Sequence, residues 1–262
     1  MDTLQQPQLG QTILALRQEK KLTQEELVEQ CNLNVRTLQR IEAGEVTPRD
    51  FTLKAIFSAL DFQIEQVASS IKKRVALSRI QIGWIAGIVY FVIGFIETGM
   101  DYSRFGGDDA VYFSLIYTLV KTISLVSFGL LMLGFVAVGT TYKSSLLKIS
   151  AYLMIGSFAI VEFYDIISIF SQISAEDFIL IKSSEAVIFG SVDIVLGIAI
   201  FRLGTDLGVI AKVTGIFEIL AGALFVTFIL AFFGLILLIP ATILEIILLH
   251  KCYENLSSST QS

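Results

Sequence analysis

Arg36 and Arg40 are two basic residues spaced four apart in a short polar stretch of the chain. On a helix this spacing places both guanidinium groups on one face, away from the buried line that Leu38 and Ile41 would form. A guanidinium can donate two hydrogen bonds to one guanine base, or it can bind a phosphate group. The pattern therefore indicates a basic helix surface of the kind that a DNA groove accepts.

Signals for helix ends surround these arginines. The hydroxyl of Thr23 can cap a first helix whose opening turn is acidic. Asn32 falls where that helix must stop, because asparagine tolerates the left-handed conformation of a helix end. Asn34 can cap a second helix, and Gly44 can end it. Residues 22–44 therefore predict two short helices packed across a tight turn.

The same stretch resembles the helix-turn-helix of the lambda-repressor-like (Cro, or Xre) family. The resemblance covers residues 9–60 and rests on three motifs: Leu-Thr-Gln-Glu-Glu-Leu at residues 22–27, Arg40-Ile41-Glu42-x-Gly44, and Pro48 before an amphipathic helix that ends in Ala59-Leu60. The chain departs from the family at Val28, where alanine is preferred, and at Asn32, where glycine is usual. The resemblance implies a five-helix domain whose second short helix enters the major groove of double-stranded DNA.

The resemblance also implies roles for individual residues. By position, the base-contacting sites are Val35, Arg36 and Arg40, and the phosphate-contacting sites are Gln24, Asn34, Thr37 and Arg49. Gln39 lies on the same side of the helix, off its buried line. Arg17 and Glu42 match a buried ion pair that ties the first helix of the domain to the recognition helix.

The second part of the chain has a different composition. Of 262 residues, 54% are hydrophobic and 16% are charged, whereas about a quarter of a soluble domain is charged. Residues 1–79 carry 11 Lys and Arg against 10 Asp and Glu, and residues 80–262 carry 8 against 14. These sums, +1 and −6, give the net charge of −5. The acidic balance comes from the second part, so it does not argue against DNA binding by the first.

Six apolar segments follow the first domain, at residues 80–98, 112–139, 147–171, 186–203, 208–230 and 234–251. A membrane-spanning helix needs about 20 such residues. The sequence therefore predicts an all-α chain with a helix-turn-helix domain at 1–68, a basic juxtamembrane linker at 69–79, a six-helix transmembrane domain at 80–252 and a polar tail at 253–262. Five or seven spans remain open, because the division within residues 208–250 rests on length alone.

Positive charge predicts the topology. The basic linker and the loops on its side of the membrane hold nine Lys and Arg residues, whereas the opposite loops hold Arg104 and Lys182. Because basic loops stay in the cytoplasm, we expect a multi-pass protein of the cytoplasmic membrane with both termini inside. The linker would contact anionic membrane lipid.

Seven ionisable residues lie inside the expected spans: Glu97, Lys121, Glu162, Asp165, Asp193, Glu218 and Glu245. Such residues are costly in lipid and usually face the interior of a bundle. Lys121 is the only cation expected at this depth, so several carboxylates could neutralise it. Two interpretations stay open: a buried network that specifies how the helices pack, or an outward-opening cavity that senses a small ligand or protons.

Cysteine and histidine usage predicts no metal site, because Cys31 and Cys252 lie far apart and His250 is the only histidine. The sequence has no nucleophile–base pair and no phosphate-binding loop, so we expect neither an enzyme nor a cofactor. Residues 1–7 lack the features of a cleaved signal peptide.

These features together predict a membrane-anchored one-component transcriptional regulator. We expect a homodimer, because proteins of this family usually bind two half-sites about one helical turn apart. One alternative is a transporter or channel-like protein whose helix-turn-helix is a regulatory or partner-binding module. Another is a structural tether for chromosome or protein.

Overall fold

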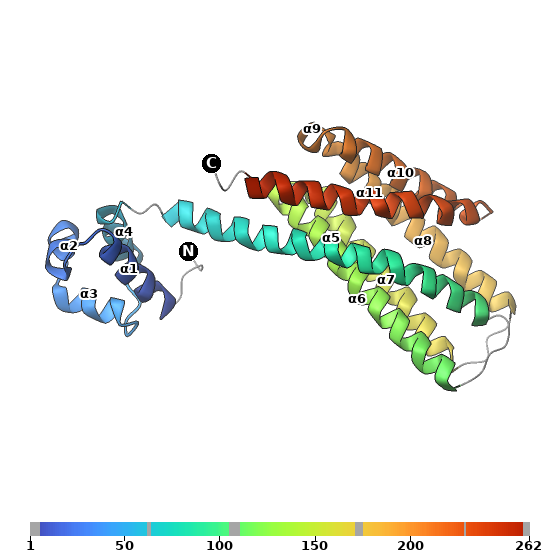
Figure 1. Ribbon diagram of the computed structural model, residues 1–262, viewed down its shortest axis with the longest axis horizontal. Coiled ribbons are helices and arrows are strands. Elements are labelled where there is room, and N and C mark those ends of the chain that lie inside the picture. Colours follow the sequence, from blue (N-terminus) through green and yellow to red (C-terminus); the bar gives the residue numbers. More distant parts are fainter. Residues whose placement is uncertain (1–5, 62–63, 105–110, 171–174, 228, 259–262) are drawn as a thin grey trace. The chain divides into compact units, whose positions relative to one another are not determined.

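The computed structural model describes residues 6–61, 64–104, 111–170, 175–227 and 229–258. Every regular element within these ranges is an α-helix (Figure 1). The chain divides into two compact units, Met1–Lys73 and Arg74–Ser262. The all-α prediction is therefore confirmed.

Four helices build the core of the first unit: α1 (Gln8–Glu19), α2 (Gln24–Cys31), α3 (Val35–Glu42) and α4 (Asp50–Ala59). Their apolar faces meet in one cluster, in which Ile13, Leu27, Leu38 and Ile56 are fully buried. Val28 is buried in the same cluster, so the core accommodates a larger side chain than the alanine that the family prefers.

The predicted helix ends are confirmed in this unit. The Glu26 amide donates to Thr23 Oγ1 at 3.1 Å, and the Thr23 amide donates to the Glu26 carboxylate at 2.7 Å, which completes a capping box. Asn32 ends α2 in the left-handed conformation, with a φ of 52°. Asn34 Oδ1 accepts a hydrogen bond at 2.9 Å from an amide in the first turn of α3. Gly44 follows α3 with a φ of 76°.

The next helix, α5 (Ile64–Arg104), differs from the prediction. The sequence predicted a separate fifth helix near Phe62, a linker at 69–79 and a span at 80–98; Phe62 itself lies outside the described residues. The structure has one continuous helix from residue 64 onward. Its first nineteen residues, 64–82, contain neither proline nor glycine, so nothing in the local sequence ends the helix there.

Within the described residues, six helices are long and apolar enough to cross a membrane, as predicted: Lys72–Ser103 in α5, Ser114–Thr141 in α6 (Val111–Thr141), α7 (Ser145–Ser168), Leu180–Arg202 in α8 (Ala175–Arg202), α10 (Val209–Val226) and α11 (Ala231–Ser258). The short helix α9 (Gly204–Leu207) connects α8 to α10. Several helices extend past their predicted ends, and α11 continues through residue 258 into the predicted polar tail.

Helix pairs in the second unit pack closely, with α6 on α7, α8 on α10, and α10 on α11 (Figure 1). The contact of α8 with α10 depends on four glycines, Gly190, Gly197, Gly215 and Gly222, which we call the glycine seam. A Cβ atom at Gly190 would lie 2.6 Å from the Gly222 carbonyl oxygen, and one at Gly215 would lie 2.5 Å from the Gly197 carbonyl oxygen. These two helices therefore meet backbone to backbone.

Candidate functional site

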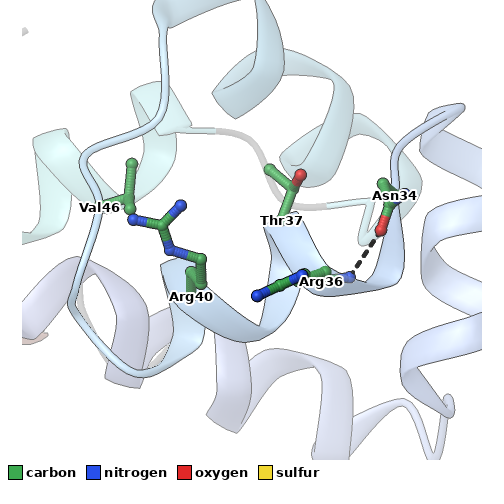
Figure 2. Close-up of a pocket in the computed structure, with 5 residues that line it drawn as sticks. All are labelled: Asn34, Arg36, Thr37, Arg40 and Val46. Atoms are coloured by element: carbon green, nitrogen blue, oxygen red, sulfur yellow. Dashed lines mark hydrogen bonds between the residues drawn. The ribbon is translucent and has the colours of Figure 1, made fainter.

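The exposed face of α3 gathers most of the residues that the sequence assigned to DNA. Arg36, Thr37 and Arg40 are exposed on α3, and together with Asn34 and Val46 they line a hollow of about 240 Å³ (Figure 2). Asn34 uses its side-chain oxygen for the helix cap, so its amide nitrogen still carries two donor hydrogens. The hollow thus combines two guanidinium groups with a hydroxyl and an amide, which are donors suited to phosphate oxygens and base edges.

Arg40 makes one weak contact within the domain. Its Nε lies 3.4 Å from Glu45 Oε2, and both side chains are more than half exposed. An exposed pair of this kind contributes little stability. Because a guanidinium has five N–H donors, the terminal nitrogens of Arg40 can bind a base while the pair persists.

A polar network fastens α3 to α1 and α2. Arg17 on α1 holds the Glu42 carboxylate with two hydrogen bonds, Nε to Oε1 at 2.7 Å and Nη2 to Oε2 at 3.1 Å. Gln24 at the start of α2 donates to the same carboxylate at 2.7 Å and accepts a hydrogen bond from Gln39 at 3.1 Å. The hydrogen bonds with Glu42 raise the pKa of Arg17. Since Glu42 is 8% exposed, this network orients α3 from its buried side.

The remaining predicted residues are placed differently. Val35 is half-buried and packs against the core, so its side chain is not part of the hollow. Gln39 is exposed on α3 and donates to Gln24, and the half-buried Gln24 in turn donates to the buried Glu42. Arg49 is exposed at the start of α4. Val46 was missed, because it lies in the loop after α3, where no helical period indicates which side chains face the hollow.

Buried charges in the second unit form two groups. The first, which we call the Lys121 cluster, contains Glu97, Asp101, Tyr117, Lys121, Glu162, Asp165, Lys182 and Glu185. The Lys121 ammonium lies 2.6 Å from Glu97, 2.8 Å from Asp165, 3.3 Å from Asp101 and 3.8 Å from Glu162. Two carboxylate-bearing helices, α5 and α7, thereby converge on α6, and α8 joins them through Lys182, whose ammonium lies 2.7 Å from Asp165.

Several members of this cluster were not expected. Lys182 was assigned to an outer loop, yet it lies 2.7 Å from Asp165, so Lys121 is not the only cation at this site. Asp101 and Tyr117 contact each other at 2.6 Å. Each lies four residues along its helix from a predicted member, Glu97 or Lys121, so helical spacing could have found both.

The second group consists of Asp193 on α8, Glu218 on α10 and Glu245 on α11, which we call the carboxyl triad. The three residues are 1%, 3% and 5% exposed. Their helices pack against one another, α8 on α10 and α10 on α11. Asp193 was expected among the partners of Lys121, but it belongs to this triad instead. Across the described ranges, no group of His, Cys, Asp and Glu side chains has an arrangement that could hold a metal ion.

Comparison with known proteins bears on the first unit. Residues 13–80 match the family model described as helix-turn-helix. A protein of Bacillus phage phi105 named "Immunity repressor protein" is 41% identical over 59 residues, which cover 22% of this chain and 41% of that relative. No solved structure shows significant similarity to the chain. The N-terminal unit is therefore a helix-turn-helix domain of the lambda-repressor-like type, as its motifs predicted.

Proposed function

We propose that this protein is a transcription regulator that binds double-stranded DNA sequence-specifically through α3. The observation that carries the proposal is the hollow that brings Arg36, Thr37 and Arg40 together on the exposed face of a helix-turn-helix domain. In this arrangement Arg36 and Arg40 contact base edges, whereas Asn34, Thr37 and Arg49 hold phosphates. The relative named as an immunity repressor supports a regulatory role.

The six apolar helices would hold this regulator in the cytoplasmic membrane. DNA lies in the cytoplasm, so the first unit must lie there too, and an even number of spans returns the carboxyl end to the same side. The exposed basic residues Lys72, Arg74 and Arg79 at the start of the first span favour this orientation, because they can bind anionic lipid headgroups. We further propose a homodimer, since one small module contacts too little DNA for tight binding.

Binding of full-length protein in lipid nanodiscs to a random DNA pool tests the proposal. We expect one enriched sequence, bound more weakly as salt rises. Arg36→Ala and Arg40→Ala should abolish the enrichment, whereas the control Lys54→Ala, which removes an exposed charge on α4 outside the hollow, should preserve it. Absence of any enriched sequence would contradict sequence-specific binding and favour a partner-binding module on a transporter or tether.

A sensing role for the bundle is favoured by the Lys121 cluster. Asp101 and Lys182 are 38% and 30% exposed, so a ligand or proton can approach the cluster at these side chains. Re-pairing of Lys121 would displace α5, the helix that carries Glu97 and continues in sequence into the first unit. We expect Lys121→Met to change expression of a regulated reporter when its synthesis is adjusted so that the level of inserted protein equals that of the unmodified protein. If Lys121→Met, Glu162→Gln and Asp193→Asn all leave the reporter unchanged, the bundle is only an anchor.

A further inference from the structure

The carboxyl triad is buried without a counter-charge. None of its three members forms an ion pair within the described part of the chain. The two lysines of the Lys121 cluster, buried Lys121 and half-buried Lys182, are engaged elsewhere: Lys121 with Glu97, Asp101, Glu162 and Asp165, and Lys182 with Asp165 and Glu185. Three ionised carboxylates in such a place would each lose hydration and repel one another.

The glycine seam forces two members of the triad together. Asp193 lies between Gly190 and Gly197 on α8, and Glu218 lies between Gly215 and Gly222 on α10. A Cβ atom at Gly197 would lie 2.8 Å from the Glu218 Cβ, so the backbone of α8 touches the base of the Glu218 side chain. The seam therefore brings the buried Asp193 and Glu218 side chains to the same part of the contact between α8 and α10.

The contact between Asp193 and Glu218 requires a hydrogen. Asp193 and Glu218 are both buried on the facing stretches of α8 and α10, where the two backbones touch. An ionised carboxylate can only accept hydrogen bonds, so the contact is attractive only when one of the two groups is protonated. Asp193 Oδ2 and Glu218 Oε1 are fully buried, and neither finds a donor among the described residues. A buried acceptor left without a donor is costly, and a proton between these oxygens removes that cost.

We propose that Asp193, Glu218 and Glu245 form an intramembrane proton-binding site in which Asp193 and Glu218 share a proton. The ligand is a proton rather than a metal ion, because the described side chains have no metal-binding arrangement. A shared proton needs no cavity, since it occupies the hydrogen bond itself.

Few other titratable groups face the site. Tyr90 on α5 is a titratable group of the bundle interior, where its ring packs against Phe128 and Phe158. On α6 the charged residue of the bundle interior is Lys121, and on α7 Glu162 and Asp165 contact that lysine. On α9, Asp206 contacts Thr205 at the α8–α10 connection.

The test is infrared difference spectroscopy of the full-length protein in nanodiscs, which detects the carbonyl band of protonated carboxyl groups. We expect such a band at neutral pH and its reversible loss as pH rises. The spectrum of the unmodified protein minus that of Asp193→Asn or Glu218→Gln should contain the band. Asp165→Asn is the matched control: Asp165 is equally buried but contacts two lysines, so its removal should leave the band intact.

The controls separate this inference from loss of folding and from the proposed function. Helical content and the elution volume in size-exclusion chromatography identify the variants that fold. If Asp193→Asn or Glu218→Gln does not fold, the conservative Glu245→Gln supplies a third difference spectrum. Difference spectra that lack the carboxyl band for every folded triad variant would overturn the proposal, and so would its loss on adding sodium at constant pH. No DNA is present in the measurement, so its outcome does not depend on DNA binding.

Discussion

The first unit and the helix bundle both bury charged groups, but they balance them in opposite ways. In the first unit one carboxylate, Glu42, receives hydrogen bonds from Arg17 and Gln24. In the bundle one ammonium, Lys121, lies within 3.8 Å of four carboxylates, and the carboxyl triad has no cation among the described residues. A carboxylate with a full set of donors has one stable arrangement. A cluster with more carboxyl groups than cations has several arrangements of similar energy, which differ in which carboxyl groups carry protons.

The contrast separates two uses of buried charge. The Arg17–Glu42 pair sets the position of α3 against α1, which a DNA-reading helix needs at all times. The bundle instead keeps acidic groups whose charge depends on their surroundings. The predictions below test this contrast, beginning with the largest expected effect.

Removing the ammonium of Lys121 should be the most damaging change. Lys121→Met leaves Glu97, Asp101 and Asp165 without their shared cation in a buried site, and we expect a loss of about 5 kcal/mol in bundle stability. Thermal unfolding in nanodiscs measures it. Lys182→Met is the matched control, because Lys182 is 30% exposed and Asp165 keeps Lys121 as a partner. Equal losses in both variants would show that the excess of acids over cations is unimportant.

Breaking the balanced pair should affect the other unit. Arg17→Met leaves Glu42 buried with only Gln24 as a side-chain donor, and we expect a loss of about 3 kcal/mol in the free energy of unfolding of the first unit. Lys20→Met serves for comparison, since it removes an exposed ion pair with Asp61 and should cost little. Circular dichroism during heating gives both values. If Arg17→Met is as mild as Lys20→Met, the network does not position α3.

Measurements of DNA affinity should distinguish residues that line the hollow from residues that hydrogen-bond Glu42. Arg40→Ala should cost about 1–3 kcal/mol in binding free energy and relax specificity at one base pair. Gln24→Ala should weaken all sequences by similar amounts, and it should also destabilise the domain by about 1 kcal/mol, because Glu42 loses a donor. Competition binding with single-base variants of the operator checks both. A change of base preference in Gln24→Ala would contradict this division.

The smallest effect concerns the capping box of α2. The hydrogen bond from the Thr23 amide lowers the pKa of Glu26. A lowered pKa in the folded state means that the cap stabilises the domain above the pKa of the unfolded chain and loses this effect as pH falls through the folded pKa. Glu26→Gln should therefore lower the melting temperature at neutral pH and lose its effect in acid. Glu29→Gln, beyond the first turn of α2, is the control.

Local signals were enough to predict the first unit. Thr23, Asn32, Asn34 and Gly44 mark their helix ends through their own backbone preferences, so they act at the predicted positions without knowledge of the fold. The motif also indicated the Arg17–Glu42 contact. Val35 was misplaced because helical spacing alone does not tell how far the core extends around α3.

The bundle was predicted less completely, because its charges are satisfied by other helices. Length and hydropathy gave six spans, but they ended the first one before Asp101 and began the fourth after Lys182. Those residues can continue a helix because Tyr117 and Asp165 on neighbouring helices bind them. Likewise, only the packing of α8 on α10 separates Asp193 from the carboxylates around Lys121.

The glycine seam also divides the glycines of the bundle by the substitutions they can accept. At Gly190, Gly197, Gly215 and Gly222 an added methyl group would meet backbone atoms of the facing helix at 2.5–2.8 Å, so even alanine would push α8 and α10 apart. At Gly94, Gly129 and Gly156 an added methyl group meets nothing within 4 Å. Alanine replacements at these seven positions should therefore fall into two classes, and the intolerant class should trace the contact line between α8 and α10.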